Sequence, residues 1–248
     1  FDIGIVPDIS DPRKVVLTGA TSKERAVLVF GNTAQGAGRV YRIQATGLAD
    51  GVQEWSFSRP AFHLLLELPG EPILTGAANA GDDDFLCLTD RRLLRCRTDT
   101  GDVTGECAPP APEKSLRWLF SPPEGPAATD TSGQLYAIDA SPMRLRPRGT
   151  PPPAEVAFDY WTSTPCGRFL TADAAGYVFR YSPVEDQWEE VGTVPVPPLQ
   201  CMAGLPDGRI VGMCGEGIGR FFHAAPPDYP PSDVGSVLAV HGAKRYGY

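Results

Sequence analysis

Helix signals are almost absent from this 248-residue chain. No apolar pattern with a period of 3.6 residues runs for more than two turns, and 26 Pro and 27 Gly interrupt every candidate. Long hydrophobic runs are missing too, because no apolar stretch approaches the roughly 18 residues of a membrane span. The chain also does not start with a signal-like segment. These absences disfavour a helical bundle and a membrane-spanning helix.

Basic runs are also lacking. The formal net charge is −8, and the sequence pI is near 4.9. Sequence-independent binding to nucleic acid rests on the neutralisation of phosphates by Lys and Arg, so this composition disfavours a nucleic-acid partner. The 42% hydrophobic content supplies enough apolar residues for a packed core and argues against disorder. We therefore expect a soluble, folded protein with no membrane partner.

What the sequence does contain is a repeat. Five segments end a loop and begin a strand in the same way, and we call these the marker strands. Their second residues are Val40, Leu93, Leu135, Val178 and Phe221. The spacings between these residues are 53, 42, 43 and 43. A period of about 40–50 residues in a strand-rich chain is typical of the four-stranded blades of a β-propeller.

Turn signals inside the repeats support this interpretation. In the last repeat, apolar runs at 199–205 and 209–213 flank Pro206-Asp207-Gly208. Asp-Gly between apolar runs is a strong hairpin signal, because Gly accepts the positive φ that such a turn demands. We therefore predict an all-β fold, with a single β-propeller domain of four-stranded antiparallel blades over residues 1–248. The approximate units are 14–57, 61–107, 115–149, 157–192 and 199–241.

One unit is longer than the others. The spacing of 53 residues assigns about ten extra residues to the second unit, and we expect them in a loop at Ala77–Asp84. Strand-like residues at both ends of the chain predict that the two ends complete one blade, since closing a ring removes exposed sheet edges. Because the chain begins with Phe and not Met, a closed five-bladed ring and part of a six- or seven-bladed ring both stay open.

Six cysteines allow cross-strand disulfides. Counting outward from the predicted hairpin turns places Cys201 opposite Cys214 and Cys96 opposite Cys107. Directly opposed strand residues have Cα atoms about 4.5–5.5 Å apart, which is within disulfide range. Free thiols that pack as small apolar residues are the alternative. No pair has the Cys-x-x-Cys plus His spacing of a zinc site, so we expect no structural metal.

One set of polar residues stands out when the units are aligned on the turn after the inner strand, which lines the central channel of a propeller. Counting eight positions back from that turn gives one residue in each of four successive units: His63, Arg117, Asp159 and Gln200. Aromatic residues lie beside this level at Trp118, Tyr160 and Trp161. A ring of polar groups with aromatic neighbours is a candidate binding site.

Such a ring can carry out elimination on an acidic sugar. Arg117 would pair with a uronate carboxylate and stabilise the enolate charge. His63 would remove the C5 proton, and Tyr160 would protonate the leaving oxygen. The residues expected to bind substrate are Asp159, Gln200, Trp118 and Trp161. The alternative is that these positions alternate between the channel and contacts between blades, because one residue of register error turns every side chain to the other face.

Two further histidines and an acidic triplet complete the candidates. His241 lies near the start of a further inner strand and is a reserve candidate for substrate binding. His223 follows two Phe residues on a marker strand away from the channel, which indicates a rim or packing role. The triplet Asp82–Asp84 lacks the alternating ligands and Gly of a calcium loop, so we interpret it as a solvated loop.

The repeats resemble those of bacterial and fungal propellers that read Pro-Asp-Gly-Arg-(Ile/Val) and then Gly-x-(Val/Leu)-(Phe/Tyr)-x-(Tyr/Asp). The matching segments here are Pro206–Ile210 and Gly176–Tyr181. That group includes polysaccharide lyases and many proteins of unknown role, and the likeness covers most of the chain. It implies the fold, and it carries over no catalytic residue. The Trp-Asp ending of WD repeats and the Gly-Gly doublet of kelch repeats are both missing.

Two function classes follow. The first is a carbohydrate-active propeller that binds an acidic, uronate-containing polysaccharide at the channel mouth and, if it is a lyase, cleaves it by β-elimination without a cofactor. The second is a non-catalytic scaffold that binds another protein across its face. The sequence favours the first class slightly, and with it a secreted or extracellular location.

Overall fold

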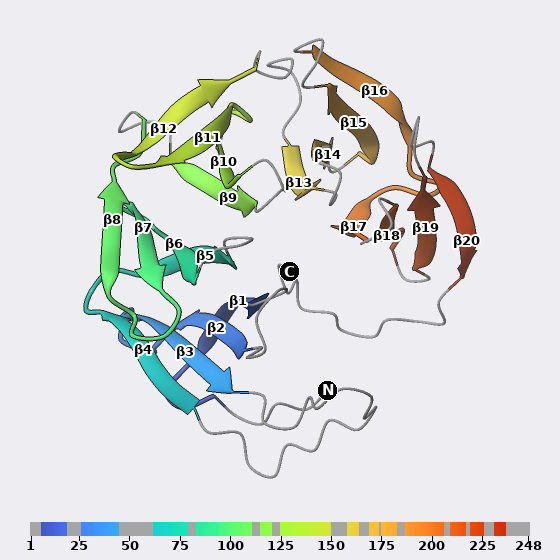
Figure 1. Ribbon diagram of the computed structural model, residues 1–248. Helices are drawn as coiled ribbons and strands as arrows, with labels where there is room; N and C mark the ends of the chain where they lie inside the picture. Colours follow the sequence, from blue (N-terminus) through green and yellow to red (C-terminus); the bar gives the residue numbers. More distant parts are fainter. Residues whose placement is uncertain are drawn as a thin grey trace, which may run out of the picture. The chain divides into compact units, whose positions relative to one another are not determined.

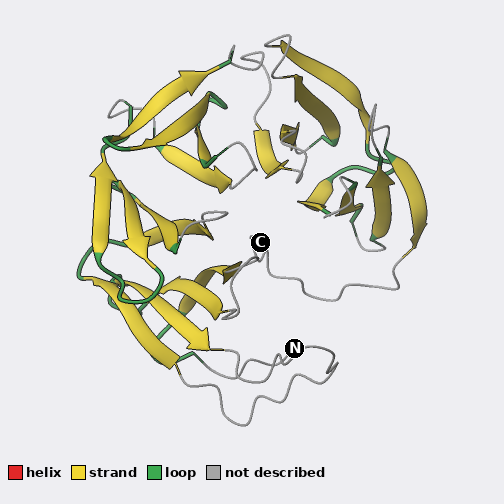
Figure 2. Cartoon of the chain, in the orientation of Figure 1, coloured by secondary structure: helices red, strands yellow, loops and turns green. Residues whose placement is uncertain are grey.

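Strands are the regular elements of the part of the chain that the structure describes (Figure 2). The structure is a computed structural model. It describes residues 6–18, 26–44, 62–78, 83–110, 115–120, 125–149, 158–163, 169–173, 175–182, 187–205, 209–216, 219–225 and 231–236. Within these ranges there is no helix long and apolar enough to cross a membrane.

The described residues form five four-stranded sheets, in each of which hydrogen-bonded neighbours follow chain order (Figure 1). The first sheet contains β1 (Asp11–Thr18), β2 (Ala26–Asn32), β3 (Gly38–Gln44) and β4 (Phe62–Leu68). The second contains β5 (Ile73–Ala78), β6 (Asp84–Thr89), β7 (Leu93–Arg97) and β8 (Val103–Cys107). The third contains β9 (Leu116–Phe120), β10 (Ala127–Asp130), β11 (Leu135–Ala140) and β12 (Met143–Arg148). The fourth contains β13 (Phe158–Ser163), β14 (Phe169–Asp173), β15 (Tyr177–Ser182) and β16 (Gln187–Thr193). The fifth contains β17 (Leu199–Gly204), β18 (Ile210–Cys214), β19 (Arg220–Ala224) and β20 (Ser232–Ser236).

The five marker strands are the third strands of these sheets: β3, β7, β11, β15 and β19. Each sheet is an antiparallel meander, which is the blade of a β-propeller. The predicted fold class is therefore confirmed. The blade that the two chain ends were predicted to share falls on residues 1–6 and 244–248, which, apart from Val6, lie outside the described residues.

A repeated turn precedes three of the five marker strands, β3, β11 and β15. The last residue of the second strand, or the residue after it, turns a side-chain oxygen back to accept a backbone N–H of the turn. These bonds run from the Ala37 N–H to Thr33 Oγ1 at 3.1 Å, from Gln134 to Asp130 Oδ1 at 3.0 Å and from Tyr177 to Asp173 Oδ1 at 2.8 Å. The same turns contain Gly at positive φ, at Gly36, Gly133 and Gly176.

The predicted boundary between the first two units is wrong. Residues 62–68 form β4, which pairs with β3 and completes the first sheet, so the second sheet begins at Ile73 and not near residue 61. The prediction of about ten extra residues in a loop at Ala77–Asp84 is wrong as well. Because β5 ends at Ala78 and β6 begins at Asp84, only residues 79–83 connect the two strands. The long connection instead joins β3 to β4, and its residues 45–61 lie outside the described residues.

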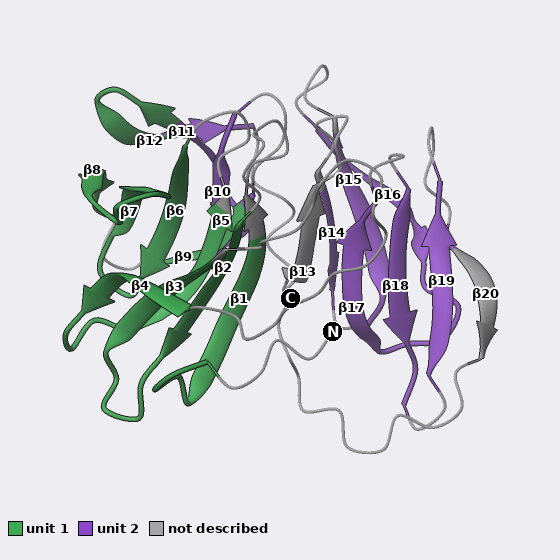
Figure 3. Ribbon diagram, turned by 60° about the horizontal axis from the view of Figure 1, so that its bottom comes forward, with its two compact units in different colours: residues 1–119, 139–145, 248 green, residues 120–138, 146–247 purple. Residues whose placement is uncertain are grey.

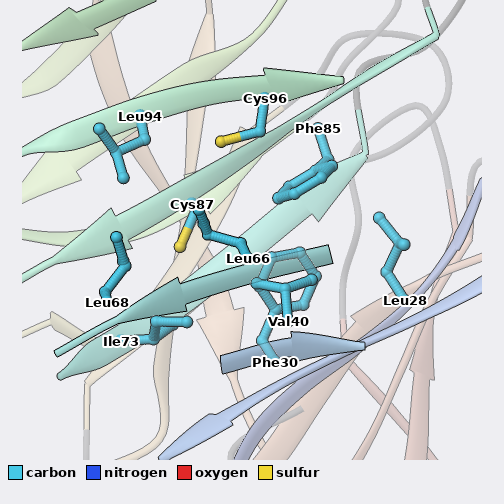
Figure 4. Packing of buried hydrophobic residues seen from close by; sticks show 10 residues of the cluster. All are labelled: Leu28, Phe30, Val40, Leu66, Leu68, Ile73, Phe85, Cys87, Leu94 and Cys96. Atoms are coloured by element: carbon cyan, nitrogen blue, oxygen red, sulfur yellow. The ribbon is translucent and has the colours of Figure 1, made fainter. Parts of the chain in front are cut away.

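Backbone contacts divide the chain into two compact units (Figure 3). Unit 1 comprises residues 1–119, 139–145 and 248, and unit 2 comprises residues 120–138 and 146–247. In unit 1 the first and second sheets bury a shared apolar core (Figure 4). Its aromatic centre is an edge-to-face pair of Phe30 and Phe85, with ring centroids 5.6 Å apart. Full burial of one such side chain contributes roughly 1.5–3 kcal/mol.

Unit 2 repeats this arrangement with the fourth and fifth sheets. Their shared core includes Leu170 and Val178 from the fourth sheet, and Ile210 and Phe222 from the fifth. In each unit the first strands of these two sheets lie side by side, β1 with β5 and β13 with β17. Sheet faces packed through apolar side chains, with the first strands adjacent, are the packing expected between propeller blades.

The disulfide pairings predicted by counting are wrong, because neither hairpin is centred where the count placed it, as the pairs nearest the turns, Gly204 with Ile210 and Cys96 with Val103, show. Cys214 lies opposite Leu199, and Cys201 lies opposite Met213. Cys96 faces Val103, whereas Cys107 faces Leu93. All five cysteines in the described ranges, Cys87 and the four just named, are free. Burial raises the pKa of Cys96 to about 12, so this thiol packs as a small apolar residue.

Candidate functional site on the first strands

The first strands of four sheets share one irregularity. The ladders of β1, β5, β13 and β17 with their second strands each skip one residue near the start of the first strand. The skipped residues are Arg13, Leu74, Asp159 and Gln200. A β-bulge adds an unpaired residue, which bends the strand and re-aims the local side chains. These four residues are therefore structurally equivalent.

Arg117 holds the corresponding position on β9. The residue before the bulge is buried in the second and fifth sheets, at Ile73 and Leu199, and Leu116 is buried in the same way. Arg117 follows Leu116 directly and is exposed. The predicted equivalence of Arg117, Asp159 and Gln200 thus agrees with their positions on the first strands.

His63 does not share this position. It lies on β4, the fourth strand of the first sheet, where it is exposed and faces Arg42 of β3. The prediction that His63 belongs to an inner strand is therefore wrong. Its cause is the misplaced boundary after the first sheet, which made an outer strand look like the start of the second unit.

Arg117 and Trp118 form a pair at the surface of unit 1. The guanidinium carbon of Arg117 lies 5.7 Å from the centroid of the Trp118 ring, within the range of a cation–π contact. The Trp118 indole Nε1 is buried and has no hydrogen-bond partner among the described residues. A cation beside an aromatic face with an unused N–H donor is suited to an anionic ligand that has an apolar ring face.

Gln200 and the β13 residues belong to unit 2. The Gln200 side chain is half-buried, and its Nε2 donates a hydrogen bond of 3.2 Å to the Gly215 carbonyl. Tyr160 is paired with Ala172 and Trp161 with Thr171. The side chains of Asp159, Tyr160 and Trp161 lie outside the described part, as does His241. That the residues of both units converge on one ligand stays a prediction.

The other two predictions concern His223 and the acidic triplet. His223 is half-buried on β19, a third strand, opposite Val211. Asp84 forms an ion pair of 2.7 Å with Arg95, and the Asp83 carbonyl accepts a hydrogen bond of 2.7 Å from the Thr98 N–H. Among the described residues no group of three or more His, Cys, Asp and Glu side chains could hold a metal ion.

Sequence reasoning missed Arg13 and Lys14, which occupy the bulge of the first sheet. Arg13 forms an ion pair of 2.6 Å with Asp11. Lys14 is half-buried, and burial lowers the pKa of its ammonium. The predicted first unit began at residue 14 and lacked the residues needed to align its inner strand. Only the ladder between β1 and β2 shows the equivalence.

No family model matches this chain, and no curated protein matches it. Among solved structures, it is similar to virginiamycin B lyase from Staphylococcus aureus, with 12% identity and a TM-score of 0.64 over 95% of this chain and 72% of that chain. It is also similar to a streptogramin B lyase, with 10% identity and a TM-score of 0.58 over 93% of this chain and 85% of that chain. At these identities the likeness shows the β-propeller fold alone. These neighbours are lyases of a different kind from polysaccharide lyases, so a kinship with polysaccharide lyases is not shown.

Proposed function

We propose that this chain is a carbohydrate-active β-propeller that binds an acidic, uronate-containing saccharide at its first strands and cleaves it by β-elimination. The observation that supports the proposal is the repeated first-strand bulge. The bulge gives Asp159 and Gln200 equivalent positions along their strands. On β9, in the other unit, Arg117 has the Trp118 ring beside it. Cations, amides and aromatic faces are the groups that recognise acidic sugars.

The proposed chemistry follows from these residue types. Arg117 pairs with the uronate carboxylate and stabilises the negative charge that develops when the C5 proton leaves. The C4–O bond then breaks as the C4–C5 double bond forms, and Tyr160 protonates the leaving oxygen. We move the role of base from His63 to Tyr160, because His63 lies on a fourth strand. A phenolate on one face of the sugar can take the C5 proton and return it to the leaving oxygen.

The names of the solved neighbours support elimination as the reaction class. Both are called lyases, one of virginiamycin B and one of streptogramin B. Their names say nothing of a carbohydrate, so virginiamycin B is the second substrate to test. The scaffold alternative needs no reaction at all and is the remaining outcome of the same experiment.

The test is a cleavage assay with purified protein on polygalacturonate, alginate and virginiamycin B. On the two uronate polymers we expect an unsaturated product that absorbs in the near ultraviolet. Arg117→Ala and Tyr160→Phe should each lower the rate by about a hundred- to ten-thousand-fold, as for a removed acid, base or charge stabiliser. Arg144→Ala, which removes an exposed arginine from β12, and His63→Ala are the controls that should keep full activity.

Three other outcomes would contradict the proposal in different ways. Cleavage of virginiamycin B alone would keep the lyase reaction and reject the carbohydrate. A large loss of activity in His63→Ala would return the base to β4 and reject Tyr160 in that role. No product and no binding with any substrate would favour a scaffold that binds protein.

A further inference from the structure

Lys14 lies beside the bulge of β1, the first strand of the first sheet. It follows the bulge residue Arg13 on β1, the same step along the strand that Tyr160 takes after Asp159 on β13. Its Cα partner across the ladder is Phe30 of β2, whose ring belongs to the buried core of unit 1. Val16, two residues further on and hence on the same face of β1, packs partly against that core. Lys14 therefore lies at the edge of an apolar face.

Among the residues that the structure describes, the strands next to β1 supply no counter-ion for this ammonium. The strand paired with β1 reads AVLVFGN and the strand packed beside it, β5, reads ILTGAA, so neither carries an ionisable side chain. On β1 itself the acidic residue is Asp11, whose carboxylate is 2.6 Å from Arg13 and also accepts a hydrogen bond from Asn32. No described residue is hydrogen-bonded to or ion-paired with Lys14.

A partly desolvated cation without a partner is unfavourable, because burial penalises the charged form and nothing nearby repays it. Natural proteins retain such groups where a ligand completes them. The commonest structural explanation is that the Lys stem covers apolar surface while its head reaches water. The two explanations predict different results when an anionic ligand is added. If Lys14 binds the anion, the pH at which its amine titrates rises; if Lys14 only covers apolar surface, that pH stays the same.

We propose that Lys14 binds a carboxylate of the acidic saccharide at the first strands, on another sugar than the one whose carboxylate pairs with Arg117, an inference that rests on the proposed function. The ligand class is a uronate, since its carboxylate can pair with the ammonium and its sugar ring can lie along the apolar edge. Lys14 thus acts in substrate binding, and Arg13, one residue earlier, stays engaged with Asp11.

The first test uses the scarcity of lysine in this chain, which has four: Lys14, Lys23, Lys114 and Lys244. The protein is acetylated with acetic anhydride over a range of pH, and each lysine is quantified by peptide mass spectrometry. The pH of half-maximal labelling reports the titration of each amine independently of how accessible it is. We expect the lowest midpoint for Lys14. Trigalacturonate should move that midpoint upward, because a bound anion favours the ammonium, and neutral galactotriose should not.

The second test measures affinity for trigalacturonate by calorimetry. Lys14→Met should weaken binding about 10- to 100-fold, the loss typical of one hydrogen bond to a charged group, and Lys14→Arg should restore part of it. Arg144→Met is the control for loss of a surface cation elsewhere and should bind like the parent protein.

The outcomes separate this inference from the proposed function. A Lys14 midpoint that trigalacturonate leaves unchanged, or unaltered affinity in Lys14→Met, would overturn the role of Lys14 even if the cleavage assay gave product. An upward shift of the Lys14 midpoint and weakened binding by Lys14→Met, without any unsaturated product, would support the role of Lys14 in binding a carboxylate. The same result would overturn the proposed elimination and leave the proposed binding intact.

Discussion

At the scale of single residues, the best-defined polar cluster is the one around Glu71. This carboxylate is buried and accepts hydrogen bonds from Arg92 at 3.0 and 2.9 Å, one to each oxygen, and from the Thr89 hydroxyl at 2.6 Å. Arg92 also donates to Glu106 at 2.6 Å. The Glu71 backbone carbonyl accepts the Gly38 N–H at 3.2 Å, so the cluster ties the second sheet to the first.

These contacts make stability depend on pH in a definite direction. The hydrogen bonds from Arg92 are the largest cause that lowers the pKa of Glu71 below its ordinary value of 4.5. A carboxyl whose pKa is lower in the folded state than in the unfolded state stabilises the fold. This contribution is fully present at a pH above the pKa of the unfolded state, and it is lost as the pH falls through the pKa of the folded state. Glu71→Gln should therefore be less stable than the parent at neutral pH and should lose less stability on acidification.

The measurement is the urea midpoint of unfolding at neutral pH and at a pH well below 4.5. Glu106→Gln is the matched control, because it removes the exposed acidic partner of the same arginine and should cost only about 0–1 kcal/mol. An equal acid-induced loss in the parent and in Glu71→Gln would show that this carboxyl does not govern the response.

At the scale of elements, neighbouring sheets approach closely enough to restrict the backbone. A Cβ added to Gly101, in the turn between β7 and β8, would lie 1.9 Å from the backbone carbonyl oxygen of Leu65 on β4. Gly101 also has a φ of +78°, and Gly36, in the turn between β2 and β3, has the same φ with nothing within 4 Å of its Cβ position. The two glycines therefore share this φ, and Gly101 alone of the two has the contact with a neighbouring sheet.

This pair separates backbone strain from sheet packing. Gly36→Ala should cost about 1–2 kcal/mol, the penalty for a Cβ in the left-handed region. Gly101→Ala should cost at least about 3 kcal/mol, because backbone atoms of β4 must also move. Urea unfolding of both variants measures the difference. Equal destabilisation would mean that the turn moves freely away from β4.

Sequence reasoning was accurate for elements with a local signal. The marker strands β3, β11 and β15 follow turns closed by Thr or Asp side chains and Gly, and this local chemistry helped to make the period visible. The bulges were not predictable, because an extra residue within an apolar run leaves no mark in the sequence. The wrong cysteine pairings have another cause: Cys201 and Cys96 lie on the turn side of their bulges, so it was the centre of each hairpin that the count misplaced.

At the scale of the whole molecule, the repeat predicted the fold class but not where each repeat begins. The β4 strand resembles an inner strand in composition, and the long connection before it hid its pairing with β3. His63 was assigned to the candidate site for that reason. Lys14 was missed because the predicted first unit began at residue 14 and lacked the residues needed to align its inner strand. The alignment of Asp159 with Gln200 agrees with the bulges of their first strands, because the repeats that contain them have nearly equal length.

The net charge of −8 gives the proposed function a test that involves the entire molecule. An acidic saccharide approaches a protein of the same sign, so long-range repulsion should slow association when salt is low. The Debye length falls from about 30 Å at 0.01 M salt to about 8 Å at 0.15 M, whereas charges in contact are screened much less. The association rate of trigalacturonate should therefore rise several-fold over this range, and that of neutral galactotriose should stay constant. Stopped-flow measurements provide both rates.

A rate for trigalacturonate that falls with added salt would instead indicate that a positive local field steers the anion to the protein. It would contradict the view that groups in contact with the anion, such as Arg117 and Lys14, bind it against the net negative charge of the molecule.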